Sequence, residues 1–213
     1  DLKEAMERLS GLGEISKLQI NPAIQRAYNP KKKPVPVSEA ALNRMRTRAA
    51  ADNGFKFNDA LLLHQWGYIN RGAYDFATEE APAIIGSDVN CEEAWELCTG
   101  DPEIIVAVLD EGVMYTHEDL TANMWVNEKE QVGSDQDNDG NGYKGDRYGY
   151  NFVKDNGNIS WQAAEDTGHG THVAGTIAAV NGNNKGVCGI AGGDGTKKGV
   201  RIMSCQVFDG DGQ

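Results

Sequence analysis

One unbroken apolar run, IIVAVL at residues 104–109, constrains the fold of this chain more than any other stretch. A turn signal stands on each side of it, Asp-Pro at 101–102 and Asp-Glu-Gly at 110–112. A short apolar run between two turns is typical of a strand that is buried on both faces, as in a parallel sheet covered by helices. The run therefore predicts a central strand of an α/β domain.

Two later segments support the same architecture. Residues 169–178 carry Val173, Ala174 and Ile177 with helical spacing, which predicts a helix that begins near His169. Residues 200–207 are mostly apolar and predict a second buried strand. A strand, a helix and a strand at this spacing indicate an α/β fold with a parallel sheet.

The chain carries a net charge of −12, with 32 acidic against 20 basic residues. This excess of negative charge repels the phosphates of nucleic acids and of anionic lipids, so we expect no nucleic-acid or anionic-membrane partner. No apolar stretch approaches the length of a membrane span, and we expect none in this chain. At 213 residues, the chain is long enough for one medium domain with its own core and a small appendage.

All four cysteines are expected to be free thiols. Cys91 and Cys98 lie in a stretch with helical character, where their Cα atoms would be roughly 10 Å apart, too far for a disulfide. Cys188 and Cys205 lie among apolar residues and are interpreted as small core side chains.

Two residues are candidates for catalysis. Asp110 follows the apolar run, at the end of a predicted parallel strand, where functional groups gather in open α/β sheets. His169 lies between glycines, which leave its imidazole edge open as a general base requires. The alternatives are a plain Asp-x-Gly turn, a helix-capping histidine, and a zinc site formed by His169 and His172. Zinc usually takes a third protein ligand, and the His-Glu-x-x-His pattern is absent.

The segments around these residues, VAVLDEGVMYTHEDL at 106–120 and DTGHGTHVAGTIAA at 166–179, resemble the aspartate and histidine signatures of the subtilisin family of serine proteases. The similarity extends from FNDALLLHQWGYIN at 57–70, through VCGIAGG at 187–193, to Phe208. The resemblance implies a subtilisin-like fold, with a parallel sheet flanked by helices. It also implies a serine endopeptidase that hydrolyses peptide bonds.

The resemblance assigns roles to individual residues. Asp110 would orient His169, and His169 would be the general base of an Asp-His-Ser triad. Thr171 and His172 would be structural. The order of aspartate before histidine agrees with the chain order of subtilisin.

The nucleophile of this family is missing from the sequence. Its Gly-Thr-Ser-Met-Ala segment does not occur, and neither does the asparagine-bearing oxyanion segment. Ser204 is the only serine after His169, and it stands inside an apolar strand pattern, so we reject it as the nucleophile. We therefore expect this chain to be inactive by itself.

The expected partners are a polypeptide substrate and a C-terminal fragment of the same protease, which carries the serine. The sheet would then be incomplete in this chain. A nicked enzyme is the favoured interpretation, because a parallel sheet cut in half exposes large apolar faces.

Two other functions are left open. One is a non-catalytic calcium-binding or peptide-binding module on a protease-like scaffold, which an alanine or glycine in place of the missing serine would favour. The other is a metal hydrolase, which an activity insensitive to chelators would exclude.

The acidic stretch DQDNDGNGYKGD, at residues 135–146, predicts a calcium loop. Alternating acidic residues around a glycine bring several hard oxygens to one point, as calcium requires. The candidate ligands of two possible registers are Asp135, Asp137, Asp139, Asn141 and Asp146. The register that starts at Asp137 would place Tyr148 at the closing position. A solvated acidic turn is the alternative, since the closing glutamate of calcium loops is absent.

A second calcium site is implied by the resemblance alone. In many subtilisins a structural calcium ion lies between the aspartate of the His-x-Asp-Leu segment and the loop after the histidine helix. The corresponding residues here are Asp119 and the loop at 181–187.

The N-terminal residues predict a separate unit. Residues 1–20 have the pattern of a helix followed by a strand, and residues 28–37 form a linker rich in proline and lysine. The segment EAMERLSGLGEISKLQINPAI resembles the last helix and strand of the inhibitory propeptide of these proteases. A generic helix–strand pair is the alternative.

We therefore expect three segments. Residues 1–28 would be the C-terminal part of a propeptide, a small α+β remnant, and residues 29–54 the tether where maturation cuts. Residues 55–213 would be the N-terminal part of the peptidase domain. The resemblance also implies a secreted, periplasmic or surface-attached protein.

Overall fold

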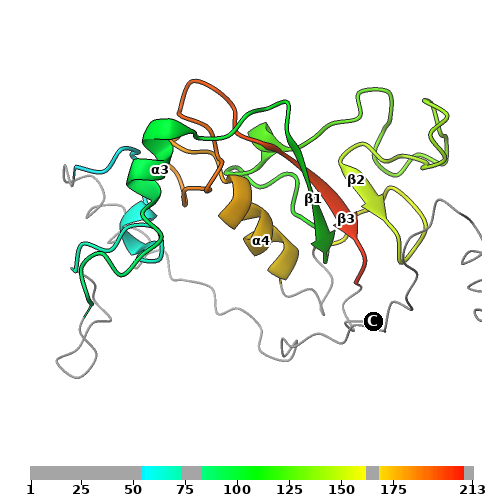
Figure 1. The fold of residues 1–213 in the computed structure, drawn as a ribbon. Coiled ribbons are helices and arrows are strands. Elements are labelled where there is room, and N and C mark those ends of the chain that lie inside the picture. Colours follow the sequence, from blue (N-terminus) through cyan, green and yellow to red (C-terminus); the bar gives the residue numbers. More distant parts are fainter. Residues whose placement is uncertain (1–53, 73–82, 162–167, 209–213) are drawn as a thin grey trace, which may run out of the picture.

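The computed structural model describes residues 54–72, 83–161 and 168–208 (Figure 1). The expected propeptide remnant at 1–28 lies outside these residues, as does the tether at 29–54 except for its last residue. None of the helices in the described ranges is both long enough and apolar enough to cross a bilayer.

The predicted parallel sheet is present, with three strands among the described residues. β1 spans Ile105–Asp110, β2 spans Gly149–Asn151 and β3 spans Arg201–Gln206, and β3 lies between the other two (Figure 1). Both pairings are parallel, and the first aligns Asp110 with Gln206. The two predicted strands are confirmed, with shifts of one residue at their ends.

The helix α4, His169–Ala178, packs against β1 and β3 and begins where the sequence predicted (Figure 1). Gly168, just before it, has φ +70°, a left-handed conformation that glycine adopts without strain. Small side chains on α4 let the helix approach the sheet closely. The core between them consists of Val108, Val113, Leu120, Met124, Ala174, Ala178, Val200 and Ile202.

The other face of the sheet is open in the described part of the chain. Along β1 the side chains of Ile105, Ala107 and Leu109 are exposed, and Leu109 is 64% exposed. Within the described residues, the expected burial of β1 is therefore met on the α4 side only, in line with the expectation that the sheet is incomplete in this chain. An apolar pattern indicates that a strand prefers to be buried, but the burial itself depends on other elements that pack on each face. Among the described residues, only the face toward α4 is packed in this way.

The cysteines are unpaired in the structure, as expected. Cys91 and Cys188 are buried and Cys98 is exposed. The expectation that Cys205 is a core residue is only partly met, because Cys205 lies on β3 with intermediate exposure.

A second apolar cluster joins the first described residues to α3, Cys91–Leu97. Phe57 meets Trp95 edge to face, with ring centroids 5.0 Å apart. The Trp95 indole N–H donates to the carbonyl of Ile190 at 2.9 Å.

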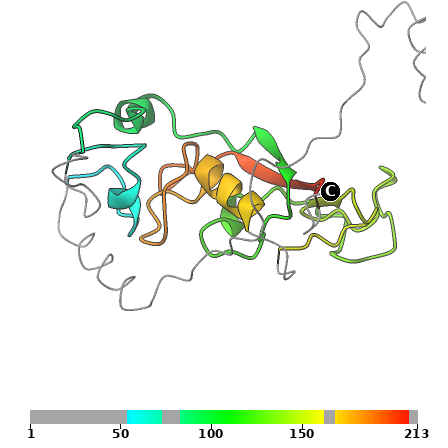
Figure 2. The same ribbon diagram turned by 90° about the horizontal axis from the view of Figure 1, so that it is seen from below.

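Figure 2 shows α3 and the 54–72 segment at one end of the molecule, with the acidic stretch at the other end. The two short 3-10 helices are Leu62–His64 and Thr121–Asn123.

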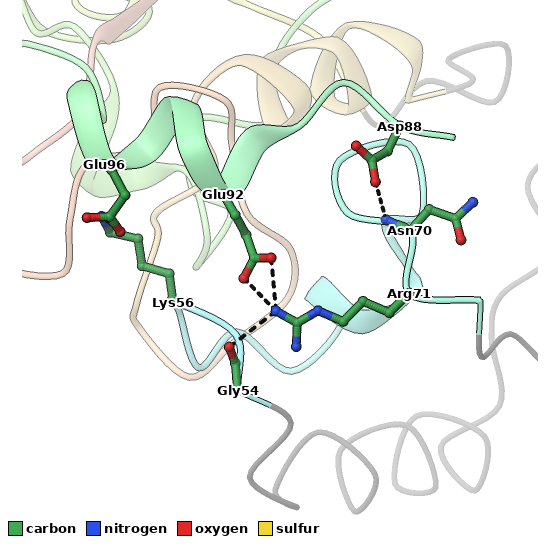
Figure 3. A network of polar contacts seen from close by, with 7 residues as sticks. All are labelled: Gly54, Lys56, Asn70, Arg71, Asp88, Glu92 and Glu96. Carbon is green, nitrogen blue, oxygen red and sulfur yellow. Dashed lines mark hydrogen bonds and ion pairs between the residues drawn. The ribbon is translucent and has the colours of Figure 1, made fainter. Parts of the chain in front are cut away.

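Polar contacts also hold the 54–72 segment to α3 (Figure 3). Lys56 pairs with Glu96 at 2.7 Å. Arg71 pairs with Glu92 at 2.7 Å and donates to the carbonyl of Gly54 at 3.2 Å. Each exposed pair contributes about 0–1 kcal/mol, so the apolar cluster dominates the stability of this contact.

Candidate active site and acidic sites

Asp110 and His169 meet at the carboxyl end of β1. The Nδ1 atom of His169 lies 2.8 Å from Oδ1 and 2.9 Å from Oδ2 of Asp110. The Asp110 side chain is 14% exposed and that of His169 is 42% exposed, so the carboxylate is sheltered while the imidazole reaches the surface. A carboxylate on Nδ1 holds a proton there and leaves Nε2 as the nitrogen that accepts a proton.

Two glycines of the sequence signatures, Gly112 and Gly170, allow the segment after Asp110 to pack closely against its neighbours. A Cβ added at Gly112 would lie 2.0 Å from the carbonyl oxygen of Ser160, and one added at Gly170 would lie 2.5 Å from that of Glu111. Neither position accepts a side chain without movement of the backbone. The turn after Asp110 therefore packs directly on the first turn of α4.

A cavity of about 920 Å³ lies beside His169. Its walls are mainly apolar and include Met114 and Leu120 from the segment after Asp110. Further lining residues are His117, Trp161, His172, Thr176 and Val187. The imidazole of His169 thus faces a space large enough for a polypeptide segment.

The acidic stretch gathers carboxylates, with one that the sequence analysis missed. Oxygen atoms of Glu130, Asp137 and Asp139 lie within 4.8 Å of one another. Glu130 is fully buried, and its carboxylate accepts hydrogen bonds from the backbone N–H groups of Asn138 and Asp139. Glu130 precedes the DQDND pattern by several residues, so the loop periodicity carried no signal for it.

Two further predicted ligands, Asn141 and Asp146, lie close to this cluster. Asn127 donates to Oδ2 of Asp139 and to Oδ1 of Asp146, both at 2.9 Å. Asn141 donates to Oδ2 of Asp146 at 3.0 Å. Burial raises the pKa of the Asp146 carboxyl. Of the predicted ligands, Asp137, Asp139, Asn141 and Asp146 are therefore brought together.

The structure leaves Asp135 outside the carboxylate cluster. Its side chain is exposed, and the oxygens that converge belong to Glu130 instead. Asp137 caps the turn by accepting N–H groups from Gly140 at 2.7 Å and Gly142 at 2.8 Å, which holds its pKa below the usual range. Tyr148, the closing position of the second register, stacks on Tyr115. The loop thus folds back onto Glu130, a buried glutamate that neither predicted register includes.

A second pair of carboxylates lies near the loop after α4. Asp119 and Asp59 are each 2% exposed, and burial raises the pKa of both. Asp119 accepts from the Asn183 side chain at 2.7 Å and from the Val187 N–H at 2.9 Å. Asp59 accepts from the Gly182 N–H at 2.7 Å, but its Oδ1 is buried without a hydrogen-bond partner.

An orphaned carboxylate oxygen beside a second buried carboxylate fits a cation site. The loop predicted from the resemblance does contact Asp119. Asp59 was not predicted, although it belongs to the FNDALLLHQW segment that the resemblance covers.

A carboxylate and an imidazole in contact at the carboxyl end of a parallel sheet are typical of α/β hydrolases that use a histidine base. A comparison with family models matches the subtilase family, Peptidase S8, over residues 101–213. This match covers just over half of the sequence, and the chain therefore belongs to the subtilase family.

Individual relatives agree with this membership. The chain is 37% identical to subtilisin-like protease 1 of Plasmodium vivax over 178 residues, which is 81% of this chain and 24% of the relative. It is 28% identical to kexin of Saccharomyces cerevisiae over 210 residues, 98% of this chain and 22% of kexin. Among solved structures, the serine protease of Aeromonas sobria is 26% identical, with a TM-score of 0.49, over 73% of this chain and 21% of that one. The chain thus spans about a quarter of the length of its curated relatives.

Proposed function

We propose that the protein carrying this chain is a serine endopeptidase that hydrolyses peptide bonds in polypeptides through an Asp-His-Ser triad. Membership of the subtilase family supports this proposal. The observation that carries it is the contact of His169 Nδ1 with both carboxylate oxygens of Asp110.

In this proposal each residue of the pair has a distinct task. Asp110 keeps the Nδ1 proton in place and stabilises the imidazolium when it forms. His169 takes a proton on Nε2 from the serine hydroxyl as the serine attacks the peptide carbonyl, and it then returns a proton to the leaving amine. The serine and the oxyanion donors would come from a segment of the protein beyond these residues.

A fluorophosphonate probe tests the proposal, because it reacts only with an activated serine. We expect the protein carrying this chain to gain the mass of the probe, at a site outside residues 1–213. His169→Ala should abolish the reaction, while Thr196→Val, in an exposed turn, should not. Labelling that is equally fast in His169→Ala would contradict the assigned base. An unlabelled wild-type protein with an alanine or glycine at the nucleophile position would favour the non-catalytic module.

We further propose that the two acidic sites hold structural calcium. Glu130, Asp137 and Asp139, with the carboxylate of Asp146 close by, would supply the hard oxygens of the first ion. Asp119 and Asp59 would bind the second, which would give the orphaned Asp59 oxygen a partner. Calcium would neutralise carboxylates that otherwise repel one another, and would thereby stabilise the loops.

The domain boundaries and the localisation are also proposals. The similarity to kexin over 98% of this chain supports an N-terminal region shared with subtilases, with a propeptide part at 1–28 and a tether at 29–54. A relative from Natrialba magadii, 37% identical over 103 residues, is named a halolysin-like extracellular serine protease, which supports export. N-terminal sequencing of the protein from culture medium should find a mature start near residue 54.

A further inference from the structure

The turn that follows Asp110, residues 111–114, donates backbone hydrogen bonds to two side-chain hydroxyl groups from different elements. One belongs to Ser204 on β3, and the other belongs to Thr171 on α4. Neither hydroxyl has a task in the proposed triad. Both nevertheless act on the backbone that immediately follows its aspartate.

Ser204 holds the middle of the turn. Its Oγ accepts a hydrogen bond from the backbone N–H of Val113 at 3.2 Å. Both residues are fully buried, so water cannot replace the serine as the acceptor. This bond gives a reason for a buried serine in the middle of β3, and the full burial of Ser204 agrees with its rejection as the nucleophile.

Thr171 holds the end of the turn. Its Oγ1 accepts from the backbone N–H of Met114 at 3.0 Å. Thr171 lies two residues after His169 on the same helix. Gly170 lies between them and lets the 111–114 turn pack directly on the backbone of α4. The same helix therefore positions both this turn and the imidazole of His169.

The backbone of Asp110 is held as well. Its carbonyl oxygen accepts from the Val207 N–H at 2.9 Å, and its Oδ1 accepts from the Glu111 N–H at 2.7 Å. With the turn anchored at Val113 and Met114, the carboxylate is left with little freedom to leave the imidazole.

We propose that Ser204 and Thr171 are positioning residues, whose hydroxyls anchor the 111–114 turn to β3 and α4 and so keep the Asp110 carboxylate on Nδ1 of His169. This inference rests on the proposed serine-protease function. A misplacement of about 1 Å in a catalytic group lowers a rate by roughly 100-fold, so loss of one of two anchors should cost about tenfold.

Steady-state kinetics of the protein carrying this chain provide the first test. Thr171→Val keeps the shape of threonine and removes the acceptor, Thr171→Ser retains the hydroxyl, and Ser204→Ala removes the other anchor. We expect Thr171→Val and Ser204→Ala to lower kcat about tenfold with KM within about twofold of wild type. Thr171→Ser should recover most of kcat. Thr196→Val, a matched loss of a hydroxyl in an exposed turn, should behave as wild type.

Proton NMR provides a second readout that needs no activity. The proton between His169 Nδ1 and Asp110 lies in a charge-assisted hydrogen bond and should resonate at low field. Its signal is identified by its loss in His169→Asn. We expect it to move upfield or broaden in Thr171→Val and Ser204→Ala and to be unchanged in Thr196→Val. An inactive wild-type protein would refute the proposed function, yet this signal would still test the anchoring.

The inference is wrong if the variants lower only the melting temperature while kcat and the low-field signal stay as in wild type. It is also wrong if Thr171→Ser is as impaired as Thr171→Val. Should Ser204→Ala fail to fold, the Thr171 series decides the question, because Thr171 is only partly buried and its variants keep nearly the same volume.

Discussion

Asp110 and His169 lie 59 residues apart in the sequence, yet Nδ1 of His169 lies 2.8 Å from Oδ1 of Asp110. Each stands at an end of a regular element, Asp110 at the end of β1 and His169 at the start of α4. Backbone hydrogen bonds hold the ends of both elements, and Oδ1 of Asp110 also accepts a hydrogen bond from the Glu111 N–H. A neutral replacement of the carboxylate therefore tests its charge and not its shape.

We expect Asp110→Asn to lower kcat by roughly 10³–10⁴-fold with little change in KM. The amide keeps the size of the side chain, but it no longer stabilises the imidazolium or enforces the proton on Nδ1. Peptide hydrolysis at neutral pH measures the effect, with the melting temperature as the control for folding. A loss of less than about tenfold would show that Asp110 does not orient His169.

The buried cysteines lead to a second prediction at this scale. Burial raises the pKa of the Cys188 thiol and of the Cys91 thiol, while Cys98 is exposed. A raised pKa in the folded state keeps these thiols protonated, and the stability linked to this proton is present below the unfolded pKa of about 8.5 and lost as the pH rises through the folded value.

We expect iodoacetamide at pH 8 to alkylate Cys98 first, and Cys91 and Cys188 only after unfolding. Peptide mass mapping over time measures the order. Equal rates for Cys98 and Cys188 would mean that the Phe57–Trp95 cluster opens in the native state.

At the scale of elements, the acidic loop and its buried glutamate form one unit. Oxygens of Glu130, Asp137 and Asp139 come within 4.8 Å of one another, and like charges at this distance repel one another. Asp135 belongs to the same DQDND pattern but lies outside this cluster. A substitution of Asp135 is therefore a matched control for substitutions within the cluster.

We expect calcium at about 100 times the Kd of this site to stabilise the protein by about 2.7 kcal/mol through this site alone, and EGTA to reverse this effect. Asp139→Asn and Glu130→Gln should abolish the part of the shift that belongs to this site, while Asp135→Asn should retain it. Differential scanning calorimetry with and without calcium measures the shift. A variant Asp135→Asn that behaves like Asp139→Asn would favour the predicted register that begins at Asp135.

At the scale of the whole molecule, the described residues cover only the α4 side of the sheet. Ile105, Ala107 and Leu109 of β1 form an exposed apolar row, and β1 is one of the two edge strands of the described sheet. An exposed edge and an apolar face together favour association with another polypeptide. A further part of the protein is the proposed cover.

We expect this chain, produced alone, to lack peptidase activity and to bind an apolar dye such as ANS. Leu109→Glu should reduce dye binding by the isolated chain, because Leu109 is 64% exposed. In the protein that carries the chain, the same substitution should instead lower the melting temperature, since it would bury a charge. Equal stability of the variant and the wild-type protein would show that this face stays open.

The strand and the helix that carry Asp110 and His169 could be predicted from the sequence. The apolar run before Asp110 and the glycine-flanked helix at His169 carry short-range patterns, and β1 and α4 follow them closely. Asp110 and His169 were identified as candidates because the residues around them form specific signatures. Pattern and signature are local properties, and a sequence states them directly.

Contacts between distant segments could not be read in the same way. Glu130 joins the acidic cluster from outside the DQDND repeat, and Asp59 meets the loop after α4 across 123 residues of sequence. The apolar pattern around Ser204 argues against a nucleophile there, but it does not predict that the Ser204 hydroxyl accepts a hydrogen bond from the Val113 N–H. Each of these depends on which backbone groups become buried together, and that follows only when the strands pair.

By itself, the sequence determined the types of its elements, the family signatures and the two residues of the proposed triad. The tertiary structure decided which carboxylates converge, which hydroxyls anchor the Asp110 turn and which face of the sheet is covered. The physical reason is the range of the interactions. Periodicity and turn chemistry act between neighbours along the chain, whereas burial, desolvation and hydrogen-bond partners are set by residues that meet only in space.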